Sequence, residues 1–119
     1  MTLTESRAVL TQALELAGIR VLPPGQAAPP SAFITQGSPW SVPAQLGAGR
    51  RAVRWVIVGV VSVASDAGTG EAEALADLVA EAVRGLPAGW GLASIETPGI
   101  LSLAGGPYLA FRAELQTVI

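Results

Sequence analysis

The stretch from Ala52 to Ser65 constrains the fold most, because apolar side chains occupy both of its alternating faces. Successive side chains of a strand point to opposite faces, so such a stretch must be covered on both sides. One face carries Val53, Trp55, Ile57, Val61 and Val63, and the other carries Val56, Val58 and Val60. The many β-branched residues favour a strand over a helix. We therefore expect a central strand, with Gly59 as a bulge or a point of close backbone approach.

A first helix is predicted over residues 4–17. Thr2 and Glu5 have the spacing of a capping box, in which the two side chains satisfy each other's backbone N–H groups. Apolar residues then recur near the 3.6-residue period of an amphipathic helix. Gly18 follows where a left-handed residue commonly ends a helix.

A second helix is predicted over residues 71–86, which carry the strongest helical pattern in the chain. Acidic residues gather at its start, as the helix dipole favours, and Pro87 ends it. We interpret the glycine-rich link at 66–70 as a capped turn. A phosphate site there is disfavoured, because the link has no lysine and carries carboxylates that would repel phosphate.

Three more strands complete the predicted order. Residues 31–36 form a short strand that Gly37 ends, and residues 92–97 and 107–119 form two strands after the second helix. The last strand alternates apolar and polar side chains, which is typical of an antiparallel strand with one buried face. We expect one α+β domain over residues 1–119 in the order α-β-β-α-β-β. Its sheet is mostly antiparallel, with two helices packed on one face.

The composition removes most catalytic chemistry. The chain has no histidine, no cysteine and, among its seven basic residues, no lysine. A serine then has no ordinary base to activate it, and the commonest metal ligand is missing. We expect no enzymatic activity, no cofactor and no metal. An enzyme that used only carboxylates would depend on Asp66, Glu71 and Glu96.

The chain carries few charges. Charged residues make up 13% and apolar residues 50% of it, whereas soluble domains average roughly 25% charged residues. The remaining apolar surface favours a subunit that buries extra area in an assembly. A net charge of −2 argues against a general nucleic-acid binder. The longest apolar run, Trp55 to Ala64, is about half of the ~20 residues that span a bilayer. With no signal peptide recognised, we expect cytoplasmic synthesis and no membrane contact.

Two charged groups are candidates for a subunit interface. They are an acidic stripe, Glu73, Asp77 and Glu81, and an arginine cluster, Arg50, Arg51 and Arg54. The acidic residues stand at i,i+4 spacing on the outer face of the second helix, where like charges disfavour one another. In a closed ring the arginines of one subunit would meet the acidic stripe of the next. The alternatives are two unrelated solvated patches, or an arginine patch that faces DNA.

Residues 37–43 hold a tryptophan between two prolines. Because proline interrupts backbone pairing, Trp40 either folds back over its own sheet or projects towards a neighbouring subunit. The same segment leads to the arginine cluster. We therefore interpret residues 37–54 as one arm at a subunit boundary, with Trp40 among the candidate interface residues.

Several short segments follow one another along almost the whole chain: Ala17-Gly18-Ile19, Pro39-Trp40, Arg54-Trp55-Val56-Ile57-Val58, the acidic helix 71–86 and Gly106-Pro107-Tyr108-Leu109-Ala110. Their order, spacing and length resemble the tail terminator proteins of long-tailed, siphovirus-type phages. None of these segments is catalytic, so the resemblance transfers no catalytic residue.

The resemblance implies a structural role in the virion. Tail terminators form a hexameric ring that caps the tail tube, ends its polymerisation and joins the tail to the head connector. The implied partners are further copies of the chain, the tail tube protein and the head-tail connector protein, with genomic DNA passing through the lumen without sequence-specific binding. The implied location is the head-proximal end of the tail, after assembly in the host cytoplasm. The alternatives are a connector or stopper protein of the neck, and a small ligand-binding or dimeric scaffold domain whose pocket is lined by Trp40, Trp55 and Trp90.

Overall fold

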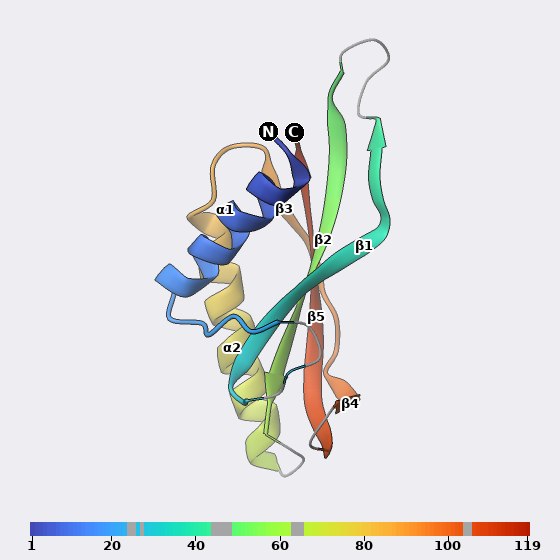
Figure 1. Ribbon diagram of the computed structural model, residues 1–119. Helices are drawn as coiled ribbons and strands as arrows, with labels where there is room; N and C mark the ends of the chain where they lie inside the picture. Colours follow the sequence, from blue (N-terminus) through green and yellow to red (C-terminus); the bar gives the residue numbers. More distant parts are fainter. Residues whose placement is uncertain (24–25, 27, 44–48, 63–65, 104–105) are drawn as a thin grey trace.

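The computed structural model describes residues 1–23, 26, 28–43, 49–62, 66–103 and 106–119. Its elements are α1 (Leu3–Leu16), β1 (Ser31–Pro43), β2 (Arg51–Val61), α2 (Asp66–Arg84), β3 (Trp90–Ile95), β4 (Gly99–Leu103) and β5 (Gly106–Val118). All strands belong to one antiparallel sheet, and both helices lie on the same side of it (Figure 1). The predicted α+β fold with two helices and an antiparallel sheet is therefore confirmed.

The strand order in the sheet is β1-β2-β5-β3, and β4 pairs with the same edge of β5 further along. The predicted element order lacked β4 and was wrong in this detail. Pro98 and Gly99 suggested a loop, but they only interrupt an edge strand, because Gly99–Leu103 pairs with residues 106–110 of β5. The observed order is α-β-β-α-β-β-β.

The ends of α1 form as the sequence predicts. The Thr2 Oγ1 atom accepts a hydrogen bond from the Glu5 backbone N–H at 3.1 Å, and the Thr2 N–H donates to Glu5 Oε1 at 3.4 Å. At the other end Gly18 has a left-handed φ of 87°. The Ile19 N–H then donates to the Leu14 carbonyl at 3.0 Å, which closes the helix with a Schellman motif.

Helix α2 begins earlier than predicted. The link at 66–70 is its first part rather than a capped turn, and the helix ends at Arg84. Each glycine in a helix costs only about 1 kcal/mol relative to alanine. The buried face that follows, which includes Leu75 and Val79, supplies the packing that holds the helix against the sheet.

The main core lies between the helices and the sheet. Helix residues such as Leu10 and Leu75 pack there against the inner face of β2 and β5. Trp55 is only 1% exposed, and its indole Nε1–H donates to the Oγ atom of buried Ser6 at 3.2 Å. Gly59 is the expected point of close approach, because a Cβ atom there would collide with the ring of Phe111.

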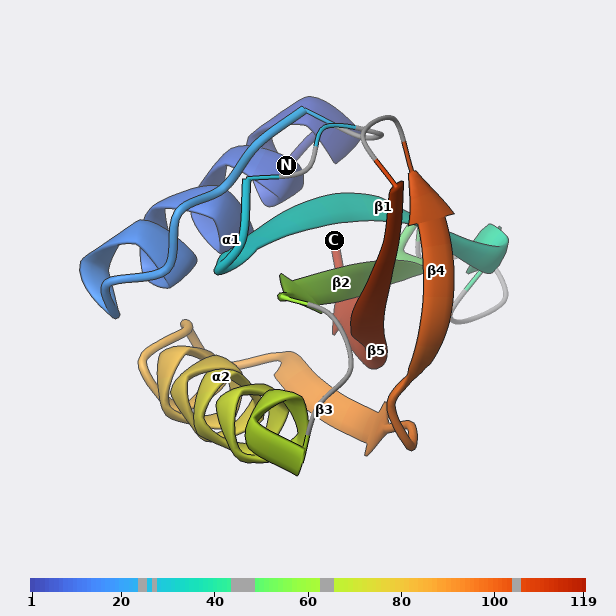
Figure 2. The same cartoon turned by 90° about the horizontal axis from the view of Figure 1, so that it is seen from below.

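A second, smaller core covers the other face of the sheet. It consists of buried Phe33, Val56, Val58, Val60 and Ala110, against which Leu101, Leu103 and Tyr108 pack. Strand β4 lies on the side away from the helices and helps to cover this face (Figure 2). The prediction that the central strand is covered on both faces is therefore confirmed. The strand ends at Val61 rather than Ser65, and residues 63–65 lie outside the described part of the chain.

Strand β1 is longer than predicted. It runs to Pro43 instead of ending before Gly37, with a register shift against β2 between Gln36 and Ser41. A Cβ atom on Gly37 would lie 2.5 Å from the Cβ atom of Arg54. Glycine at this position therefore lets the two strands pass closely and lets pairing resume beyond the irregularity.

Candidate subunit-interface site

The residues that the sequence predicts as an arm at a subunit boundary lie at the far end of the β1–β2 hairpin. The described residues of this arm are 37–43 and 49–54, and residues 44–48 lie outside the described part of the chain. The hairpin extends past the helices and both chain termini (Figure 1), and the molecule measures 51 × 24 × 22 Å. A projecting hairpin of this kind exposes backbone and side chains to a neighbouring molecule.

Trp40 folds back over its own sheet. Its ring meets the ring of Trp55 edge to face, with centroids 5.7 Å apart and an interplanar angle of 74°. The side chain is nevertheless 38% exposed. Trp40 therefore covers the end of the core with one part of its ring and leaves another part on the surface. The sequence offered two interpretations, that Trp40 covers its own sheet or that it contacts a neighbouring subunit, and this position is compatible with both.

The three arginines of the predicted cluster do not form one patch. Arg54 points away from the helices, since its neighbour Trp55 points towards them, and its Nη1 atom lies 3.8 Å from Oε1 of Glu114. Arg51 has the same strand parity as Trp55 and projects on the helix side, where it is exposed. Arg50 is exposed as well. The cluster is split because adjacent strand residues face opposite sides of a sheet.

The acidic stripe lies in solvent as predicted, since Glu73, Asp77 and Glu81 are all exposed. Glu81 is ion-paired to Arg84 at 3.3 Å and lines a shallow groove against α1. In the part of the chain that the structure describes, Glu73 and Asp77 form no ion pair. They are the part of the stripe that is available to an outside cation.

An exposed apolar strip along the β3–β4 edge is a feature that the sequence reasoning missed. It consists of Leu92, Ile95 and Ile100, which are 36%, 38% and 63% exposed. Leu92 and Ile95 pair with the core-facing Leu115 and Ala113 of β5, so these two side chains lie on the helix side of the sheet. Ile100 borders the cleft on the other face, which Phe33 and Arg112 also line. The signal was present in the sequence, because residues 90–95 contain no charge, but the sequence does not say which strand is at the edge.

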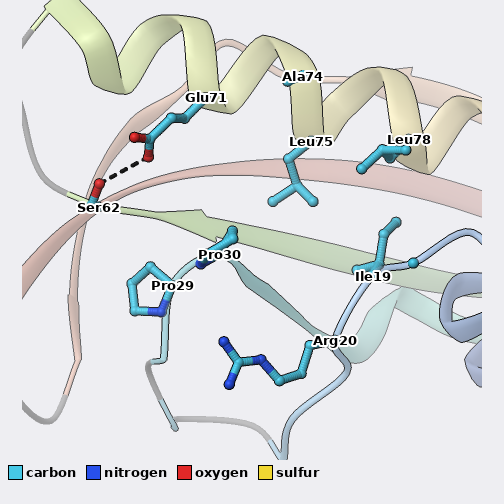
Figure 3. A pocket seen from close by; sticks show the side chains of 10 residues that line it. Ile19, Arg20, Pro29, Pro30, Ser62, Glu71, Ala74, Leu75 and Leu78 are labelled. Carbon is cyan, nitrogen blue, oxygen red and sulfur yellow. Dashed lines mark hydrogen bonds between the residues drawn. The ribbon is translucent and has the colours of Figure 1, made fainter.

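The two described carboxylates of the catalytic alternative, Glu71 and Glu96, are not brought together. Glu71 borders an apolar pocket of about 380 Å³ beside α2, where its carboxylate accepts a hydrogen bond from Ser62 Oγ at 2.9 Å (Figure 3). Glu96 lines a different cleft, which also contains Phe33 and Arg112. The side chain of Asp66 lies outside the described part of the chain.

The three tryptophans do not share a pocket, which corrects the expectation attached to a ligand-binding domain. Trp55 is buried beneath Trp40, and Trp90 lies on β3 at the other edge of the sheet. The pocket in Figure 3 is lined instead by aliphatic groups such as Ile19 and Leu75. The residue types and register around the tryptophans favour packing over ligand stacking.

Within the described residues, no group of three or more acidic side chains is arranged to hold a metal ion. No helix there is long and apolar enough to cross a bilayer. No protein-family model matches the chain, and no curated protein matches its sequence. The structural features that bear on function are therefore the arm, the apolar strip and the charges beside them.

Proposed function

We propose that this protein is a structural subunit of the phage tail terminator type. It forms a hexameric ring that caps the tail tube, ends its polymerisation and joins the tail to the head connector, and DNA passes through the lumen without sequence-specific binding. The observation that carries the proposal is that the two edges of one sheet present unlike surfaces. The edge formed by β1 carries the arm with Trp40, and the apolar strip runs along the β3–β4 edge.

Unlike surfaces on opposite edges favour a head-to-tail contact. Such a contact joins different patches of two identical subunits, and it generates a ring when the rotation between subunits closes. A subunit that instead exposed one self-complementary patch would favour a two-fold dimer. The hexamer itself comes from the family resemblance, and the structure contributes the reason for a cyclic arrangement.

The chemistry of the described residues supports a non-catalytic role. The chain has neither histidine nor cysteine, and its basic residues are all arginines. Glu71 and Glu96 line separate cavities, so they form no acid–base pair. The buried side-chain polar atoms among the described residues all have hydrogen-bond partners, as expected for groups that serve packing.

A phage that lacks this protein tests the proposal. Electron micrographs should show overlong tails without heads, because nothing then ends polymerisation of the tube. The second candidate is a connector or stopper ring of the neck, which the same pair of unlike edges would also serve. Filled heads that lose their DNA, beside tails of normal length, would favour that role and contradict the terminator.

A further inference from the structure

The outer edge of β1 is protected against pairing along most of its length. The N–H group of Ala32 donates to the Arg20 carbonyl at 2.8 Å, and the Ile34 carbonyl accepts from Arg7 Nη2 at 3.3 Å. Near the far end of the strand, Pro43 has no N–H group to offer. Proteins commonly block edge strands in these ways to prevent association with other chains.

The edge of β1 is open beside Trp40. Arg51 and Ile119 exchange both of their backbone hydrogen bonds, so alternate residues of β2 turn their backbone towards β5 and towards β1. The register then leaves Gln36 and Ser41 with backbone groups that point outwards. These two residues flank the register shift that contains Trp40.

The opposite edge of the sheet has little protection. Strand β3, Trp90–Ile95, contains neither a charged residue nor a proline, and its irregularity is a register shift between Leu92 and Ser94. By the same alternation, the backbone groups of Leu92 and Ile95 point outwards. Exposed edge strands with apolar side chains are sites of association between chains.

The two open edges lie at the same level of the molecule. Gln36, Trp55, Leu115 and Leu92 form one row across all four strands β1, β2, β5 and β3. The side chains of this row lie on the helix side, and the ring of Trp40 packs against Trp55. A neighbour placed beside the molecule without an axial shift would therefore bring its Leu92 to Gln36 and Trp40. A closed ring requires a contact without axial rise, together with a rotation between subunits that closes, whereas a contact with axial rise gives a helical filament.

The charged groups lie away from this contact. Arg51 is four residues beyond Trp55 towards the arm, whereas the start of α2 lies at the other end of β2, where Glu71 accepts a hydrogen bond from Ser62 and Leu75 lies beside Gly59. Without an axial shift, Arg51 of one copy is therefore too far along the strands to pair with Glu73 and Asp77 of the next copy. Arg54 projects from the other face towards Glu114. The contact therefore depends on the two open edges and their apolar side chains.

From these contacts we infer that β3 of one copy docks against β1 of the next at Gln36–Ser41. Trp40 covers Leu92 of the neighbour at this contact. The occupant of the apolar strip is thus a second copy of this chain. The inference rests on the proposed ring and specifies its subunit contact.

Disulfide cross-linking tests this contact, since the chain has no cysteine of its own. The variants Gln36→Cys and Leu92→Cys are mixed and oxidised at concentrations at which sedimentation detects oligomers, and the products are separated on a non-reducing gel. Paired positions on adjacent strands have the spacing that a disulfide needs. Leu16→Cys is the matched control, because Leu16 is 82% exposed on α1, away from both edges.

The mixture of Gln36→Cys and Leu92→Cys should give linked dimers, and the double variant should give a ladder of larger products. Gln36→Cys mixed with Leu16→Cys should give at least tenfold less. Linkage of Leu92→Cys to itself at the same yield would show a two-fold β3–β3 contact and overturn the inference. A mixture that links no better than the control, or a chain that forms no oligomer, would overturn it too.

Rings that form without the Gln36–Leu92 link would end this inference and leave the proposed function intact. If the Gln36–Leu92 link formed but phage without the protein had normal tails, the proposed function would be wrong and the subunit contact would stand.

Discussion

Truncation of Trp40 separates its role in the fold from its role in assembly. The side chain is 38% exposed, so it buries about three-fifths of its surface. For a side chain of roughly 250 Å² at ~25 cal/mol per Å², this gives an upper limit of about 4 kcal/mol. Alanine keeps part of this burial, and the site opens to solvent instead of leaving a cavity. We therefore expect Trp40→Ala to lower the free energy of unfolding of the monomer by about 2 kcal/mol.

The loss in assembly should be larger, because a ring contains the contact at every subunit boundary. Truncating a central tryptophan costs about 2 kcal/mol or more at one interface, which is roughly 30-fold in affinity. Urea unfolding of the dilute monomer, followed by circular dichroism, gives the first quantity, and sedimentation gives the second. Trp40→Phe is the control that keeps a ring on Trp55. If Trp40→Ala destabilised the monomer but assembled like the parent protein, Trp40 would serve its own core only.

Three further substitutions test the packing that positions the site, each by urea unfolding. Gly59→Ala should lower the free energy of unfolding by about 2 kcal/mol, because a Cβ atom there meets an aromatic ring of β5; Gly91→Ala, which has open space, should change it little, and equal effects would contradict this packing. Gly18→Ala should cost about 1 kcal/mol through its left-handed φ of 87°, and no loss would show that the helix end relaxes. Ser6→Ala should cost about 1–3 kcal/mol, since the Trp55 indole N–H loses its buried acceptor; a neutral result would show that another acceptor replaces it.

The elements with local signals could be predicted from the sequence. Thr2 and Glu5 cap α1, and Gly18 ends it, because these interactions involve residues at most a few positions apart. The doubly apolar β2 identified the centre of the sheet, since only a covered strand tolerates apolar side chains on both faces. The close approach at Gly59 followed from the same pattern.

The extents of β1 and α2 and the presence of β4 could not be predicted. Proline and glycine signalled ends in all three places, but pairing with β2 and β5 and packing on the core override these local preferences. The pairing of Glu81 with Arg84 and the division of the arginine cluster between two faces have a related cause. Which side a residue faces depends on strand parity and on partners distant in sequence, as the pairing of Arg54 with Glu114 shows.

The open edges of β1 and β3 could not be predicted from the sequence. The protection of β1 depends on Arg7, which reaches Ile34 from another element. The exposure of Leu92 depends on β3 being the last strand beside β5. Neither fact has a local signature, so the sequence could nominate the arm and its tryptophan but not the surface that receives them.

The mass of the purified protein in solution, alone and after addition of purified tail tubes, tests the central claim most directly. Sedimentation or native mass spectrometry should show a hexamer, or a monomer that becomes a ring at the ends of the tubes. Electron micrographs of the same mixture should place that ring at one end of each tube. A stable monomer or dimer that leaves the tubes uncapped would contradict the proposal.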